Sequence, residues 1–150
     1  MSNYYLDTSA LAKRYVVEVG TGWTRHLIQP SAGNVALISD LSTVEIISLL
    51  ARRQRENLLT AAIRLSLENA FRLHARQQYL VFPMDEPVLV QARQFVGKHV
   101  LRTLDAIQLA TAVYAARLLN TPLTFITADN NLLTAASAEG LATDDPSAHP

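Results

Sequence analysis

The stretch Tyr4-Tyr5-Leu6-Asp7-Thr8-Ser9 places a short apolar strand directly before three residues whose side chains can cap a helix. A strand that leads straight into a helix is typical of folds in which parallel strands are connected by helices. The stretch therefore predicts a strand at residues 4–6 and a helix at residues 10–17. It also puts an acidic side chain, Asp7, at the end of that strand.

The same alternation continues along the chain. Further apolar strands are predicted at residues 35–38, 79–82 and 123–126, with a short extended piece at residues 141–143. Helices are predicted at residues 23–29, 40–56, 60 onward, 85–99, 103–119 and 129–139. We therefore predict an α/β fold, a single domain over residues 1–143 with a central parallel β-sheet sandwiched by helices. Residues 144–150 are expected to be a frayed tail.

The helix that begins near residue 60 has the clearest period. Ile63, Leu67 and Phe71 are predicted to lie on its buried stripe, with Ala70 and His74. The residues expected in an exposed row are Arg64, Glu68, Arg72 and Arg76.

The composition is that of a globular protein of 150 residues, 49% hydrophobic and 17% charged. Its 13 basic and 13 acidic residues give a formal charge of zero, which argues against a large basic surface for nucleic acid. Because the chain has no cysteine, disulfides, thiolate zinc sites and cysteine nucleophiles are excluded. No secretory signal or membrane span is visible, so we expect a cytoplasmic protein.

Four acidic residues stand in apolar surroundings: Asp7 and Asp129 after strands, Glu45 within a helix, and Asp105 near the start of the most apolar helix. Ligands of open α/β sheets gather beyond the carboxyl ends of the strands, where Asp7 and Asp129 are expected to meet. Each acid has an ordinary alternative role. Asp7 and Asp129 can cap helices, Glu45 can be a surface residue, and Asp105 can interact with the helix dipole. Asp105 is the hardest to explain in this way, because an unpaired carboxylate there would have a raised pKa.

A shared metal ion would account for all four acids, since it relieves both their burial and their mutual repulsion. Oxygen ligands without a nearby histidine or thiolate favour Mg²⁺ or Mn²⁺. Such an ion can activate water and stabilise the leaving oxygen in phosphodiester hydrolysis. The candidates for phosphate contacts, each with a solvated surface charge as the alternative, are Lys13, Arg14, Arg102 and the cluster Arg52, Arg53 and Arg55.

These residues resemble the motifs of PIN-domain ribonucleases, and most closely those of the VapC toxins of bacterial toxin–antitoxin pairs. The segment around Asp105 is the most specific part of the resemblance, which spans nearly the whole chain. The matching pieces are residues 5–11 (YLDTSAL), Glu45, residues 101–112 (LRTLDAIQLATA), residues 126–129 (ITAD) and residues 139–141 (EGL).

The resemblance implies an endoribonuclease that cleaves RNA with Mg²⁺ or Mn²⁺. Asp7, Glu45, Asp105 and Asp129 would be both the catalytic and the metal-binding residues. Thr127 stands where the family often has a hydroxyl near the site, with a strand-end threonine as the alternative. The resemblance also implies a cognate antitoxin and a homodimer. Some relatives carry a further acid where this chain has Asn130-Asn131, which leaves catalysis by one metal ion open.

Two other functions compete with this one. The first is a non-catalytic PIN-like module that binds RNA or a protein, although the chain keeps all four acids. The second is a phosphatase or phosphotransferase with Asp7 as nucleophile, although the second aspartate expected two residues later is Ser9 here. The nuclease hypothesis requires the four acids to meet in one pocket.

Overall fold

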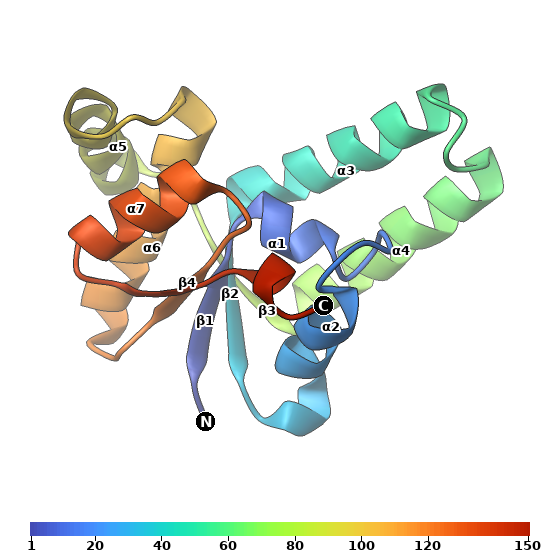
Figure 1. Cartoon of the computed structure of the whole chain (residues 1–150), viewed down its shortest axis with the longest axis horizontal. Helices are drawn as coiled ribbons and strands as arrows, with labels where there is room; N and C mark the ends of the chain where they lie inside the picture. The colour runs from blue at the N-terminus through green and yellow to red at the C-terminus, as the bar shows by residue number, and fades with distance from the viewer.

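Five short strands form one sheet, and helices cover both of its faces (Figure 1). The computed structural model describes residues 1–150. The strands are β1 (Asn3–Leu6), β2 (Val35–Ser39), β3 (Tyr79–Phe82), β4 (Thr124–Ile126) and β5 (Ala142–Asp144). The α-helices are α1 (Thr8–Ala12), α2 (Thr21–Ile28), α3 (Asp40–Arg55), α4 (Ala61–Gln77), α5 (Glu86–Lys98), α6 (Thr103–Leu119) and α7 (Asn130–Ala138). Two short 3₁₀ helices are η1 (Pro30–Ala32) and η2 (Pro146–Ala148). The predicted fold class is confirmed.

Strand β1 lies at the centre of the sheet, whose order is β3-β2-β1-β4-β5 with every neighbouring pair parallel. From β1 the chain runs outward through β2 to β3, and then returns by α5 and α6 to β4 on the other side of β1. The strand order therefore reverses between β1 and β4. An open α/β sheet offers a crevice for a ligand at such a point, outside the carboxyl ends of the strands.

Side chains of the sheet alternate between two hydrophobic cores. Tyr5 and Phe125 stack with ring centroids 5.4 Å apart in the core beneath α5, α6 and α7. Their neighbours Leu6 and Ile126 enter the second core, beneath α1 to α4. Because both faces are covered, consecutive residues of these strands are apolar, as in residues 4–6 and 125–126, and the strands appear as compact apolar runs in the sequence.

Helices α3 and α4 form a hairpin that projects from the body of the molecule (Figure 1). The predicted faces of α4 need one correction. Glu68, expected in the exposed row, is buried, whereas Ile63 is 50% exposed. The buried arc of α4 is rotated toward Phe71, and Glu68 lies one turn before that residue. Burial is tolerated because Arg64 Nε lies 3.3 Å from the Glu68 carboxylate.

The boundaries of α1 and α2 differ from the prediction. Helix α1 stops at Ala12 rather than residue 17, because the N–H of Lys13 bonds to the carbonyl of Ala10 and tightens the last turn. Helix α2 begins at Thr21 rather than residue 23, directly after Gly20, whose φ is +87°.

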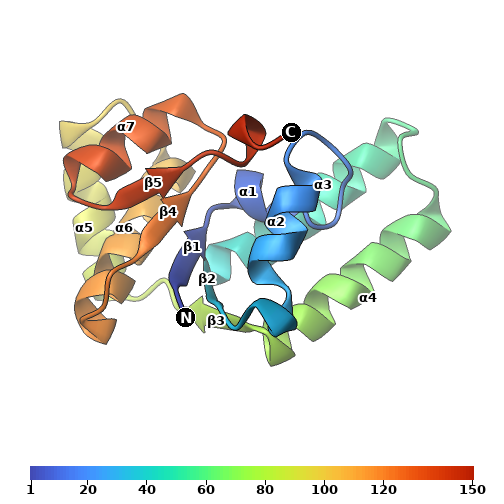
Figure 2. The same cartoon turned by 60° about the horizontal axis from the view of Figure 1, so that its bottom comes forward.

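The C-terminal residues are packed rather than frayed, contrary to the expectation for residues 144–150. Asp144 ends β5, Pro146 is buried, and the His149 ring stacks on Trp23 of α2 with centroids 4.3 Å apart. Figure 2 shows the C-terminal end of the chain beside α2. The His149 ring also lies 2.9 Å from the Asp144 carboxylate. Composition alone does not predict these contacts, because Trp23 and the tail are far apart in sequence.

None of the helices combines the length and apolar character needed to cross a membrane.

Candidate metal centre

All four predicted acids line one cavity of about 650 Å³ at the carboxyl edge of the sheet. Asp7 follows β1, Asp129 follows β4, Glu45 projects from α3 and Asp105 from the first turn of α6. The strand reversal between β1 and β4 explains why Asp7 and Asp129 share this edge.

The Asp7 carboxylate is buried and held by three donors. Its Oδ1 accepts hydrogen bonds from the backbone N–H of Ala10 at 2.9 Å and from the Ser9 hydroxyl at 2.7 Å, and its Oδ2 accepts from the Thr127 hydroxyl at 2.6 Å. Capping of α1 and a place in the cavity were weighed as alternatives for Asp7, and the structure combines them. Burial outweighs the three donors and raises the pKa of Asp7 to about 6, and the charge of Asp105 adds to this.

Thr127 is fully buried between two of the acids. Its hydroxyl donates to Asp7 and accepts from the backbone N–H of Asp129 at 3.1 Å. The hydroxyl therefore contacts the carboxylate of Asp7 and the backbone of Asp129. Thr127 directly follows β4 and also lies against Asp7, so the structure combines the two interpretations.

Glu45 is half-buried and belongs to a polar network that sequence analysis missed. Its Oε1 accepts from the Thr8 hydroxyl at 2.7 Å and from the Gln108 amide at 3.0 Å. The same amide also reaches Ser42, and the Gln108 carbonyl oxygen accepts from the Tyr5 hydroxyl at 2.7 Å. The available signal was a lone glutamine in a very apolar helix, three residues after Asp105, because a buried amide needs partners.

Asp105 is 30% exposed, and its closest cation is Arg102, with Nε 3.9 Å from the carboxylate. Burial, followed by the charge of Asp129, raises the pKa of Asp105, and Glu45 contributes in the same direction. The raised pKa predicted for Asp105 is confirmed in direction. Asp129 caps α7 by accepting from the N–H of Leu132 at 2.9 Å, and so it also combines a capping role with a place in the cavity.

The side chains as they stand form no ready-made ligand cluster, since no group of three or more His, Cys, Asp or Glu residues is arranged to hold a metal ion. Lining a common cavity needs no mutual contact, whereas a Mg²⁺ ion needs oxygens at about 2.1 Å from one point. The donor set nevertheless suits a hard cation, because it is all oxygen and because the acids raise one another's pKa values. The cavity also has room for the waters that Mg²⁺ retains.

The basic residues proposed near the site do not all line the acidic cavity. Arg102 and Arg52 line the acidic cavity. Lys13 does not, because its ammonium is buried against Glu18 and the carbonyl of Val19. Arg53 lies 3.9 Å from Glu18. The remaining candidate beside Asp7 in sequence, Arg14, points into a different cavity. The turn that ends α1 after Ala12 carries both Lys13 and Arg14 away from the carboxyl edge.

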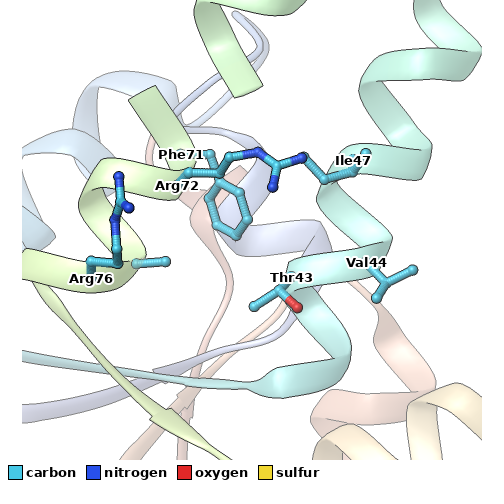
Figure 3. Close-up of a pocket in the computed structure, with 7 residues that line it drawn as sticks. Thr43, Val44, Ile47, Phe71, Arg72 and Arg76 are labelled. Carbon is cyan, nitrogen blue, oxygen red and sulfur yellow. The ribbon is translucent and has the colours of Figure 1, made fainter. Parts of the chain in front are cut away.

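A second hollow of about 490 Å³ lies between α3 and α4 (Figure 3). Val44 and Ile47 contribute from α3, and Phe71, Arg72 and Arg76 from α4. It contains no acidic side chain, and Val44 lines both this hollow and the acidic cavity. We call it the α3–α4 groove.

Comparison with known proteins agrees with the fold. Residues 4–137 match the family described as PIN domain. Ribonuclease VapC47 of Mycobacterium tuberculosis (strain CDC 1551 / Oshkosh) is 33% identical over 146 residues, which are 96% of this chain and 97% of the relative. The family match, the identity to this relative and the fold thus define a PIN-domain protein, and the chain belongs to this family. Within the family it belongs with the VapC-type ribonuclease toxins of toxin–antitoxin systems, as predicted from the sequence.

Solved structures show the same fold at lower identity. The crystal structure of Mycobacterium tuberculosis VapC20, described as a sarcin–ricin loop cleaving toxin, has a TM-score of 0.65 and 19% identity, covering 99% of this chain and 100% of that chain. VapBC2 from Rickettsia felis, bound to a DNA fragment from its promoter, has a TM-score of 0.65 and 9% identity, covering 95% of this chain and 97% of that chain. These likenesses support the fold alone.

Proposed function

We propose that this protein hydrolyses RNA phosphodiester bonds with Mg²⁺ or Mn²⁺ held by Asp7, Glu45, Asp105 and Asp129. The observation that supports the proposal most directly is the single cavity lined by these four carboxylates. Burial and mutual repulsion raise the pKa values of Asp7 and Asp105, and a divalent cation would relieve both effects.

The surrounding residues would fix the acids before RNA binds. Ser9, Ala10 and Thr127 set the orientation of Asp7, while Gln108 and Thr8 set that of Glu45. Well-oriented ligands reduce the reorganisation needed when the charged substrate arrives.

The bound cation would supply an activated water and charge stabilisation at the phosphate. Arg102 and Arg52, which line the same cavity, are placed to bind phosphates next to the one that is cleaved. Arg102 is 91% exposed, so it is free to reorient toward RNA.

The test is cleavage of a fluorescent RNA with Mg²⁺ and with EDTA, for the natural protein and for Asp7→Asn and Asp105→Asn. We expect EDTA and either substitution to lower the rate by about a hundredfold or more, since each removes a charge from the metal site. Asp40→Asn, at an exposed residue of α3 outside the cavity, is the matched control and should leave cleavage unchanged. Undiminished cleavage by both site variants would contradict the proposal. Metal-independent RNA binding without cleavage would favour the non-catalytic module instead.

We also propose that a cognate antitoxin binds the α3–α4 groove. Its floor is apolar, with the Phe71 ring and Ile47, and its rim carries Arg72 and Arg76, neither of which has an ion-pair partner (Figure 3). This chemistry suits an apolar segment flanked by acidic residues. Arg76→Glu should weaken the toxin–antitoxin complex in calorimetry while leaving RNA cleavage by the free toxin intact.

We also propose that the protein forms a homodimer and acts in the cytoplasm, where RNA is present. Exposed apolar side chains on α5, on the turn after it and at the start of α6 would supply the dimer surface: Val96 (46% exposed), Val100 (83%) and Leu104 (47%). Light scattering of Val100→Asp should then report a shift toward monomer.

A further inference from the structure

A cavity separate from the acidic one lies between the turn after α1, α2 and α4. Its volume is about 380 Å³, and it shares no lining residue with the metal site. Its polar lining consists of Arg14, Arg25, Gln29 and His74, and no acidic residue lines it. Two guanidinium groups therefore share a cavity that offers them no counter-charge.

Arg14 is half-buried and fixed by neutral partners. Its Nη1 donates to the Tyr79 hydroxyl at 2.8 Å and its Nη2 to the Gln78 side-chain carbonyl at 2.8 Å. The guanidinium carbon lies 5.6 Å from the centroid of the Tyr79 ring. Tyr79 is in turn bonded to Tyr15 at 2.6 Å between hydroxyl oxygens. These contacts hold the positive charge in place without neutralising it.

Arg25 brings the second charge to the same place. Its Nε donates to the backbone carbonyl of Arg14 at 3.1 Å, and both arginines line the cavity. None of the ion pairs of the chain includes Arg14 or Arg25. The terminal Nη groups of Arg25 have no partner within the protein, so up to four N–H donors remain for a ligand.

We propose that this cavity binds a phosphate group between Arg14 and Arg25. Arginine forks match the paired oxygens of phosphate, and a bound anion would supply the counter-charge that the lining of the cavity lacks. His74 and Gln29 line the same cavity and supply further polar contacts. The phosphate can come from the end of an RNA or from free inorganic phosphate, and the chemistry of recognition is the same for both.

His74 gives the proposal a spectroscopic readout. Its Nδ1 lies 2.9 Å from the Tyr15 hydroxyl and its Nε2 lies 3.4 Å from Arg14 Nη2. Burial and the positive charge of Arg14 lower the pKa of His74. The groups that face the ring are thus Arg14, Tyr15 and Tyr79, together with Arg25 across the cavity. An anion bound to Arg14 should raise the pKa of His74 again.

The experiment is calorimetric titration of the full chain in EDTA with three probes: inorganic phosphate, a 5′-phosphorylated dinucleotide, and the same dinucleotide without its 5′-phosphate, which keeps only the phosphodiester between the two nucleosides. We expect saturable binding of the first two and at least tenfold weaker binding of the third. Tighter binding of the phosphorylated dinucleotide would identify RNA ends as the source, and equal or weaker binding would identify free phosphate.

Arg25→Gln should weaken phosphate binding about tenfold, the loss expected for one charge-assisted pair of hydrogen bonds. Arg117→Gln, which changes another arginine without an acidic partner, should leave binding unchanged. Arg14→Lys keeps the charge but loses the fork, so it should also bind less tightly while the chain stays folded. In a proton NMR titration, sulfate, whose charge is constant over this range, should raise the pKa of His74 in the natural protein only. Absence of saturable binding, or equal binding by Arg25→Gln, would overturn the proposal.

Discussion

At the scale of single residues, Asp7 is subject to opposing effects. Three hydrogen-bond donors favour its charged form, while burial and the neighbouring acids favour the protonated form, and the pKa of about 6 shows that burial dominates. The folded pKa lies above the value of 3.8 for an unperturbed side chain, so the folded state holds a proton that the unfolded state releases. Stability in the absence of metal should therefore fall as pH rises from about 4 to about 6.

We expect Asp7→Asn to stabilise the metal-free protein by about 1–3 kcal/mol near pH 7.5, because it removes a buried charge. The amide oxygen can still accept from Ala10 and Ser9, and the Thr127 hydroxyl can rotate to accept from the amide. The gain should vanish near pH 3.5, where the natural side chain is protonated in both states. Urea denaturation at the two pH values, in EDTA, measures the difference. If Asp7→Asn destabilised the protein equally at the two pH values, the Asp7 carboxylate would be charged in the folded state, with its hydrogen bonds satisfied.

Arg102 offers a second prediction at this scale. Because it lines the acidic cavity and is almost fully exposed, its role in the proposed reaction is to contact one RNA phosphate. Arg102→Ala should lower the slope of log binding constant against log salt by about 0.7, the value for one contact with a single strand. The measurement uses a non-cleavable RNA in EDTA, and Arg93→Ala, on α5 and outside the cavity, is the control. An unchanged slope would remove Arg102 from the interface.

At the scale of elements, α6 connects the core to the site through Gln108. Gln108→Leu should destabilise the protein by about 2–4 kcal/mol, because it leaves the buried hydroxyls of Tyr5 and Ser42 without this partner. RNA cleavage should also decline, since Glu45 loses one of its two fixing donors. Thermal unfolding and cleavage rates test both effects. Gln94→Leu, at an exposed position of α5, should change neither.

Gly20 lies at the junction of α2 with the C-terminal tail, and Gly33, which follows η1, provides a comparison. Both glycines have a positive φ, +87° at Gly20 and +70° at Gly33. A Cβ on Gly20 would lie 2.3 Å from the carbonyl oxygen of Pro146, whereas a Cβ on Gly33 would have nothing within 4 Å. Gly33→Ala should therefore destabilise by about 1 kcal/mol, the backbone penalty alone. Gly20→Ala should destabilise by about 2 kcal/mol or more, because the tail must also move. Equal losses in denaturant titrations would mean that the tail is not fixed against α2.

At the scale of the whole molecule, metal binding should couple distant segments. About 10 mM Mg²⁺ should raise the unfolding temperature near pH 7.5, since an ion that binds only the folded chain stabilises it. The shift should shrink below about pH 6, because Asp7 must lose its proton before it can bind metal. Asp105→Asn should abolish the shift. NaCl at matched ionic strength controls for screening, and an equal effect of NaCl would contradict a specific site.

We could predict three features from the sequence: the sheet, the parallel direction of its strands, and the edge at which the acids lie. Each strand is a short apolar run followed by a helix cap, so local and long-range preferences agree. Glu68 and Gln108 were not predicted, because their burial depends on which partner helix approaches them. The role of Trp23 was hidden for the same reason, since its partner His149 is at the other end of the chain. Whether the four acids adopt the spacing of a coordination shell is a matter of ångströms, which residue patterns do not encode.

The central position of β1 has a consequence for synthesis on the ribosome. Its pairing with β4 requires residues that are translated long after β1, and the hydroxyl that orients Asp7 belongs to Thr127, 120 positions downstream. A nascent polypeptide that has emerged only as far as α6 carries Asp7, Glu45 and Asp105 without this hydroxyl and without Asp129. The order of translation itself therefore delays assembly of the cavity lined by the four acids until the start of α7 has been made.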